Sequence, residues 1–142
     1  MTAYWTAMIR QQFYVEHYWE VIVFYDLDFD LFQYIEEELL SIGFPLREID
    51  ILYYQLWSGY AKAVTCSNLL YNTSIILFNP HPSRQDYLDS IVHEAEHVKQ
   101  AMLEAYRVED MGEPPAYTIG YLISRMYPVF KNIICGCYRY GI

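Results

Sequence analysis

The stretch from Ile91 to Val98 reads Ile-Val-His-Glu-Ala-Glu-His-Val and places His93 and His97 four residues apart. In a helix, residues at this spacing lie one above the other, with Cβ atoms about 5–6 Å apart. One tetrahedral zinc ion bridges that span with Zn–N bonds of about 2.0–2.1 Å. Glu94 points about 100° around the helix from His93, so its carboxylate can reach a metal-bound water without being a ligand. The spacing predicts a metal site with Glu94 as general base.

Flanking residues support a helix across this motif. Ser83 with Asp86 three residues later is close to a capping box and predicts a helix that starts there and runs to about Arg107. On a helical wheel, most apolar residues share one arc, roughly opposite the two histidines, and Lys99 falls inside that arc. The helix is therefore expected to bury one side and to present both histidines to a cleft. The predicted apolar arc consists of Leu88, Ile91, Val92, Ala95, Val98, Met102 and Tyr106.

A catalytic zinc ion usually has three protein ligands and one open position. Glu104 lies about two turns beyond His97 on the same helix, too far along the axis to close the site. A turn at 109–112 reverses the chain, so Glu113 can open a second helix beside the first, reaching about Phe130. Glu113 is therefore the predicted third ligand, and Gly120 on the same face predicts a close approach of the two helices. The candidates considered were Glu113, Glu109, Asp110, Glu104 and His81.

The rest of the chain predicts one α+β domain over residues 1–142, because no repeat or linker divides it. Residues 20–26, 61–66 and 74–78 are β-branched or aromatic and predict strands, the last two joined through a turn at 68–73. A helix is expected after Asp28 or Asp30 and ends at Gly43. Residues 3–19 fit an N-terminal helix or an extended arm, and residues 48–57 fit strand or helix.

The composition limits the kinds of molecule that this protein is expected to bind. The net charge is −9, and the nine basic residues form no run, so nucleic acid and anionic membranes are not expected as partners, whereas a cationic peptide would be attracted. The first residues do not have the pattern of a secretory signal. Cys66, Cys135 and Cys137 have neither a disulfide nor a zinc-site spacing, so we expect free thiols and a location in the reducing cytoplasm. The 16 tyrosines predict a half-wet surface that suits either peptide binding or self-association.

The motif His93-Glu94-x-x-His97, followed by Glu113 at the start of a helix, resembles the gluzincin metallopeptidases. The stretch Glu113-x-x-Ala116-Tyr117-x-x-Gly120 is similar to small zincin-like proteins of phages and prophages. The resemblance covers about residues 58–128. It implies a zincin-like fold, with a small mixed or antiparallel sheet packed on the histidine helix and the glutamate helix following. It also implies a Zn²⁺ cofactor held by His93, His97 and Glu113, with Glu94 as base and an extended substrate paired to an edge strand.

Two departures from the family leave alternatives open. Larger gluzincins often carry an aspartate four residues after the ligand glutamate, where this chain has Tyr117. The usual oxyanion donor is also missing, and Tyr117, Tyr121 and Tyr60 are the candidates for that catalytic role. The sequence predicts a zinc metallohydrolase, in particular a peptidase acting on peptides or proteins. The alternatives are a binding or structural protein with a structural zinc, and a latent enzyme whose segment 131–142 covers the cleft.

Overall fold

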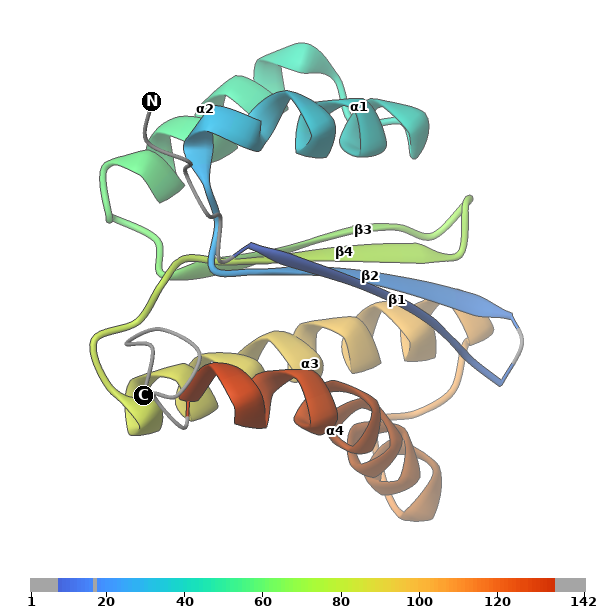
Figure 1. The fold of residues 1–142 in the computed structure, drawn as a ribbon. Helices are drawn as coiled ribbons and strands as arrows, with labels where there is room; N and C mark the ends of the chain where they lie inside the picture. Colours follow the sequence, from blue (N-terminus) through green and yellow to red (C-terminus); the bar gives the residue numbers. More distant parts are fainter. Residues whose placement is uncertain (1–7, 17, 135–142) are drawn as a thin grey trace.

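The computed structural model describes residues 8–16 and 18–134, which form one mixed sheet with helices on both faces (Figure 1). The strands are β1 (Ile9–Val15), β2 (Trp19–Tyr25), β3 (Ala63–Asn68) and β4 (Thr73–Phe78). A 3-10 turn, η1 (Phe29–Leu31), precedes the helices α1 (Phe32–Ser41), α2 (Leu46–Trp57), α3 (Arg84–Tyr106) and α4 (Glu113–Ile134).

The sheet order is β1-β2-β4-β3. β1 pairs with β2 and β3 pairs with β4 as antiparallel neighbours, and the central β2–β4 pair is parallel. The two central strands are almost continuously apolar and buried, as expected for strands covered on both faces. The three strands predicted from the sequence are confirmed, and β3 lies at the edge of the sheet.

Helices α1 and α2 cover one face of the sheet, and α3 and α4 cover the other (Figure 1). Successive side chains of β4 point to opposite faces of the sheet, so this strand contributes to both core clusters. Ile75 and Leu77 join the core cluster beneath α1 and α2, whereas Ile76 and Phe78 join the cluster shared with α3 and α4. The motif helix α3 therefore packs directly on the sheet face, next to the β3 edge.

The structure shows the secondary structure of two segments for which the sequence allowed two interpretations. Within the predicted N-terminal helix or arm (3–19), residues 9–15 form the strand β1, whereas residues 3–7 lie outside the described part. Residues 48–57 belong to α2, which starts after Pro45 and buries Ile49 and Leu56, two turns apart. The last helix extends beyond the predicted end at Phe130, to Ile134. No described helix is both long and apolar enough to cross a membrane.

Candidate metal centre

Both ends of α3 are fixed by local hydrogen bonds. The Ser83 hydroxyl accepts a hydrogen bond from the Asp86 backbone N–H at 3.1 Å, which confirms the predicted N-cap. At the other end Arg107 adopts a left-handed conformation (φ 56°), and the Val108 N–H donates to the Leu103 carbonyl at 2.9 Å. This pattern is a Schellman-type ending, which turns the chain back on itself after the helix.

The buried side of α3 differs in part from the predicted arc. Ile91, Ala95, Val98 and Met102 are buried as expected. However, the arc's other members, Leu88, Val92 and Tyr106, are exposed. Glu94, which lies outside the arc, is buried, as is Lys99 within it. The reason is that α3 contacts β3 on one flank and α4 on the other. Its buried surface is therefore wider than the predicted arc and extends toward β3.

The two motif histidines face each other on the exposed side of α3. Their Nε2 atoms are 3.1 Å apart, and the ring planes cross at 79°. Two nitrogen ligands at about 2.0–2.1 Å from one tetrahedral zinc would be separated by about 3.3 Å. The rings of His93 and His97 are therefore already close to the separation that a shared zinc ion requires.

Glu94 is buried beside this pair, with 3% of its surface exposed. One carboxylate oxygen lies within 4.8 Å of a ring nitrogen of each histidine. The Oε2 atom has no hydrogen-bond partner among the described residues. Burial raises the pKa of Glu94, and the nearby His93 partly offsets that increase. A buried carboxylate oxygen without a described hydrogen-bond partner, next to two imidazoles, is a candidate proton acceptor for water at the site.

The cleft at this site has a volume of about 330 Å³ and lies between the start of β3 and α3. His93 and Glu94 line it together with Lys62, Ala63, Asp89 and Ser90. Lys62, Asp89 and Ser90 are not among the site residues predicted from the sequence. Asp89 lies one turn before His93, so helical periodicity extended backwards could have found it. Lys62 belongs to the predicted strand 61–66 at the edge of the sheet, so its position beside the histidine helix could have been predicted.

The open edge of β3 borders the cleft. The Asn79 N–H donates to the Lys62 carbonyl at 3.0 Å. Since peptide groups alternate in an antiparallel pair, Ala63, Thr65 and Ser67 direct their N–H and C=O groups away from β4. In the described part of the chain no other strand pairs with that side. The edge therefore offers backbone hydrogen-bonding groups next to the histidine pair.

The other ligand candidates are placed as follows. Glu113 is the first residue of α4, but its side chain lies outside the described part of the chain. His81 Nδ1 lies 2.6 Å from the Asn79 carbonyl oxygen and Nε2 lies 2.7 Å from the Ser90 hydroxyl, so both ring nitrogens are engaged. Glu104 is exposed two turns beyond His97, and Asp110 pairs with Lys99.

The tyrosines considered for oxyanion stabilisation lie in different places. Tyr117 is 73% exposed and lines a second cleft, of about 430 Å³, with Glu16 rather than with His93. Tyr121 donates its hydroxyl to the Tyr14 carbonyl at 3.0 Å. Tyr60, two residues before Lys62, is 86% exposed. Neither Tyr117 nor Tyr121 lies in the cleft at the histidine pair. Tyr60 is close in sequence to Lys62, which lines that cleft.

The predicted close approach of α3 and α4 at Gly120 is wrong. A methyl group built at this position meets no atom within 4 Å, so the glycine does not serve a close approach of α4 to α3. Instead, the two helices are held together by larger side chains of α4 that pack into the core: Leu122, Met126, Phe130 and Ile133.

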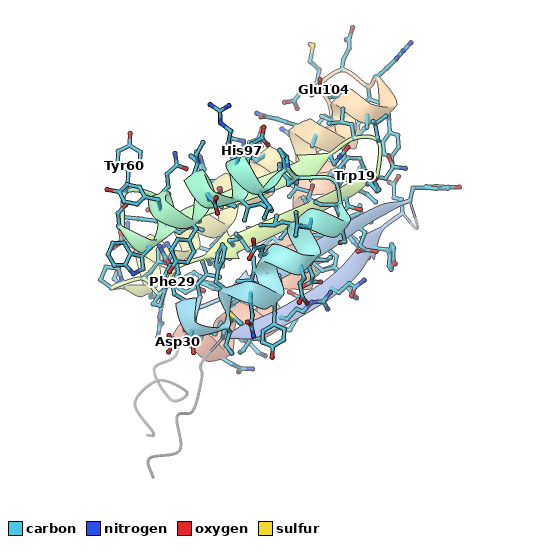
Figure 2. The ribbon with its side chains drawn as sticks, turned by 90° about the horizontal axis from the view of Figure 1, so that it is seen from above. Trp19, Phe29, Asp30, Tyr60, His97 and Glu104 are labelled. Atoms are coloured by element: carbon cyan, nitrogen blue, oxygen red, sulfur yellow. The ribbon has the colours of Figure 1, made fainter. Side chains whose placement is uncertain are left out.

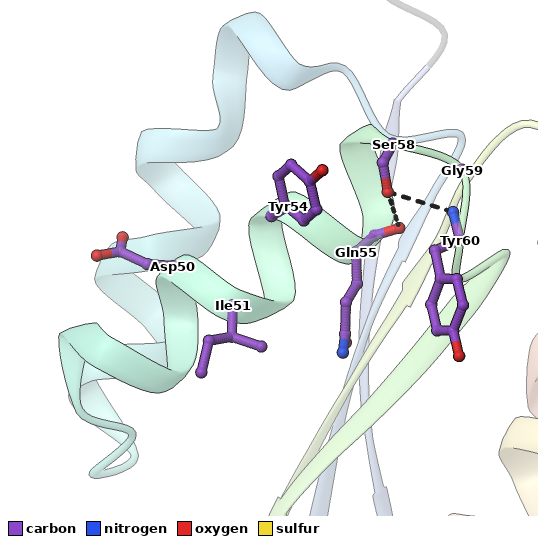
Figure 3. Close-up of a pocket in the computed structure, with 7 residues that line it drawn as sticks. All are labelled: Asp50, Ile51, Tyr54, Gln55, Ser58, Gly59 and Tyr60. Carbon is purple, nitrogen blue, oxygen red and sulfur yellow. Dashed lines mark hydrogen bonds between the residues drawn. The ribbon is translucent and has the colours of Figure 1, made fainter.

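A larger pocket, of about 840 Å³, lies on the outer side of α2. Ile51, Gln55 and Tyr60 extend to the same side of this helix (Figure 3). Seen from above the α1–α2 layer, Tyr60 and His97 lie toward the same edge of the molecule, although α3, which carries His97, covers the other face of the sheet (Figure 2). The pocket wall is mainly apolar, with Asp50 at one end. This pocket and the cleft at His93 therefore flank the same end of β3.

Cys66 lies on β3 as a buried free thiol, as expected. Burial raises its pKa to about 12, with a further contribution from Glu94, so the thiolate is not available as a metal ligand or nucleophile at neutral pH. Cys135 and Cys137, and most of the segment 131–142 considered as a cover for the cleft, lie outside the described residues.

The chain matches no known protein family, no curated protein and no solved structure. The likeness to gluzincins therefore remains a resemblance carried by the motif and its spacing.

Proposed function

We propose that this protein is a zinc-dependent metallohydrolase of gluzincin type that cleaves peptide bonds. The observation that carries the proposal is the facing pair of His93 and His97, with Nε2 atoms 3.1 Å apart, beside the buried carboxylate of Glu94. The predicted third ligand is Glu113. This donor set of two imidazoles and one carboxylate, with a second carboxylate as base, suits a catalytic zinc site.

His93, His97 and Glu113 would hold the zinc ion, which would supply a water of strongly lowered pKa and a Lewis acid for the peptide carbonyl. Glu94 accepts the proton of the attacking water and delivers it to the leaving amine. Lys62 brings a positive charge to the same cleft, where negative charge develops on the carbonyl oxygen.

The substrate we propose is an extended peptide that adds to β3 as a further strand. Ala63 and Thr65 offer it backbone hydrogen bonds at the open edge. Alternate side chains of such a peptide point toward α3 and toward α2. Those on the α2 side meet the pocket lined by Ile51, Tyr54 and Tyr60, which accommodates large apolar side chains.

The metal content of the purified full chain tests the site. We expect about one equivalent of zinc per chain, and less than about half an equivalent after native purification would contradict the proposal. His93→Ala and His97→Ala should each abolish stoichiometric binding, because two remaining donors do not make a catalytic site. Glu104→Gln changes an exposed residue two turns away on the same helix and should leave the zinc content unchanged.

Proline at the edge of β3 tests the mode of substrate binding. Ala63→Pro removes one N–H that points to the open edge, at the first residue of the strand, where proline is tolerated. We expect KM for an extended peptide to rise by roughly fivefold, because one buried hydrogen bond contributes about 1 kcal/mol. Ala63→Ser keeps the N–H and should retain the wild-type KM. Equal KM values for the proline and serine variants would exclude strand addition at this residue.

A further inference from the structure

Ser90 and His81 form a hydrogen-bonded pair at the cleft that the proposed metal chemistry does not use. The Ser90 Oγ atom lies 2.7 Å from Nε2 of His81. On the other side of the ring, Nδ1 lies 2.6 Å from the carbonyl oxygen of Asn79. A hydroxyl bonded to an imidazole, which a third group orients in turn, is the arrangement that activates a serine for nucleophilic attack.

The carbonyl of Asn79 determines which nitrogen of His81 carries the proton. A carbonyl oxygen can only accept a hydrogen bond, so Nδ1 must be the donor. A neutral imidazole has a single N–H, which leaves the lone pair of Nε2 facing the Ser90 hydroxyl. Ser90 therefore donates its hydroxyl hydrogen to the ring, as a nucleophile does to its general base.

The surroundings of His81 fix the orientation of the ring. Only 4% of the residue's surface is exposed, and the ring stacks on Tyr87 with centroids 4.4 Å apart and planes 29° apart. Together with the two hydrogen bonds, this contact holds Nε2 against Ser90 before any substrate arrives.

Burial also keeps the His81 ring uncharged. Desolvation lowers its pKa, although the carbonyl of Asn79 and the charges of Asp26 and Asp86 act in the opposite direction. The positive charge of Lys62 acts in the same direction as burial. At neutral pH the imidazole is therefore in the form that can take a proton.

Ser90 is half-buried and lines the cleft of about 330 Å³ between β3 and α3. Its place in this wall is what distinguishes it from a serine that only satisfies a buried histidine. Lys62 lines the same cleft, and its ammonium group can stabilise the negative charge that develops on a carbonyl oxygen under attack. The volume is at the lower end of the range for small-molecule sites, so the cleft suits a small substrate.

We propose that Ser90, activated by His81, takes the acyl group from small carboxylic esters in a reaction that needs no metal ion. The Oγ atom of Ser90 bonds to the carbonyl carbon while its proton passes to Nε2 of His81. The bond from that carbon to the leaving oxygen then breaks, and His81 returns the proton to the departing alcohol or phenol. The acyl group stays on Ser90 as an ester until water hydrolyses it, again with His81 as base.

The test uses the full chain in EDTA with p-nitrophenyl acetate and measures the release of p-nitrophenolate. We expect the wild type to be faster than Ser90→Ala, and the difference between them is the Ser90-dependent rate. His81→Gln should lower that rate by about 10²- to 10⁴-fold, the usual contribution of a general base. Equal rates for the wild type and Ser90→Ala overturn the proposal.

Ser124→Ala is the matched control for Ser90→Ala. It removes an exposed serine from the helix α4, where the hydroxyl donates to the Tyr121 carbonyl at 2.7 Å. It should keep the wild-type rate. A loss equal to that of Ser90→Ala would show that the reaction does not depend on the pair of Ser90 with His81.

Ser90→Cys keeps a nucleophile beside the imidazole and tests its activation even if Ser90→Ala disturbs the fold. A neighbouring imidazole lowers the pKa of a thiol, so iodoacetamide at neutral pH should alkylate position 90 about tenfold faster than in Ser90→Cys combined with His81→Gln. Peptide mapping separates this position from the native cysteines. Equal rates overturn the proposal. Neither result changes the zinc content, so the proposed zinc site is judged by its own measurement.

Discussion

Replacing Glu94 with glutamine is expected to lower kcat/KM for peptide hydrolysis by about 10²- to 10⁴-fold, the usual contribution of a general base. Glutamine preserves the shape of the side chain and cannot take a proton from water. The zinc content should stay at the wild-type level, because Glu94 is not among the predicted ligands. Cleavage of a mixture of quenched fluorescent peptides, compared at equal zinc loading, gives the measurement.

The same substitution should also stabilise the metal-free protein at neutral pH. Burial raises the pKa of Glu94 in the folded state, and its Oε2 has no hydrogen-bond partner among the described residues. A raised carboxyl pKa favours the folded state at pH values below about 4.3, and this contribution is lost as the pH rises through the folded-state pKa. In EDTA, Glu94→Gln should therefore gain stability over wild type with rising pH and show no advantage near pH 4.

Glu96→Gln is the matched control for the activity measurement, because Glu96 lies in the same motif, is partly exposed and pairs with Lys99 rather than lining the cleft. It should retain activity. If Glu94→Gln loses zinc as well as activity, Glu94 is a ligand and not the base. If the wild type holds zinc and cleaves no peptide in the mixture, the alternative of a structural zinc in a binding protein is favoured.

Trp19→Ala is expected to lower the free energy of unfolding by about 3–5 kcal/mol, the cost of removing a large aromatic from a core. Trp19 is fully buried at the start of β2, and its ring meets the edge of Tyr106 near the end of α3, with centroids 6.1 Å apart. Its Nε1–H donates to the Ser74 hydroxyl at 3.0 Å, and that hydroxyl lies 2.7 Å from the Ser67 hydroxyl. One side chain thus joins three strands to the motif helix.

Chemical denaturation of three variants checks this account. Trp19→Phe keeps most of the apolar ring and loses the hydrogen bond to Ser74, so a smaller loss of about 1 kcal/mol is expected. Trp57→Ala removes an exposed tryptophan from α2 and should change stability by no more than about 0.5 kcal/mol. A loss for Trp57→Ala equal to that for Trp19→Ala would contradict the burial described for the two rings.

Local signals in the sequence were sufficient for most of the elements. Ser83 caps α3 by the hydrogen bond that its spacing to Asp86 predicts, and Gly43 follows the end of α1 with a φ of 91°. The facing histidines also follow from spacing alone, because the helix geometry fixes their separation. The α+β class and the three predicted strands are confirmed for the same reason: each depends on patterns within a few residues.

What could not be predicted depends on contacts between distant segments. The burial of Glu94 requires β3 on one flank of α3, and the helical wheel of α3 does not encode that neighbour. Residues 48–57 remained ambiguous because Ile51, Leu52 and Tyr53 form a short apolar run that suits strand and helix equally. Similarly, Tyr117 lies one turn after Glu113 in sequence, but packing of α4 against the β1–β2 turn places it in another cleft.

The parallel pairing of β2 with β4 has a consequence for how the molecule folds. Both antiparallel pairs join strands close in sequence, so each can form early from local encounters. The central pair must close a loop that contains α1, α2 and β3, and such long-range closure is slow. The surface on which α3 packs is complete only after that step. The cleft between β3 and α3 is therefore completed late in folding, after the central strands have paired.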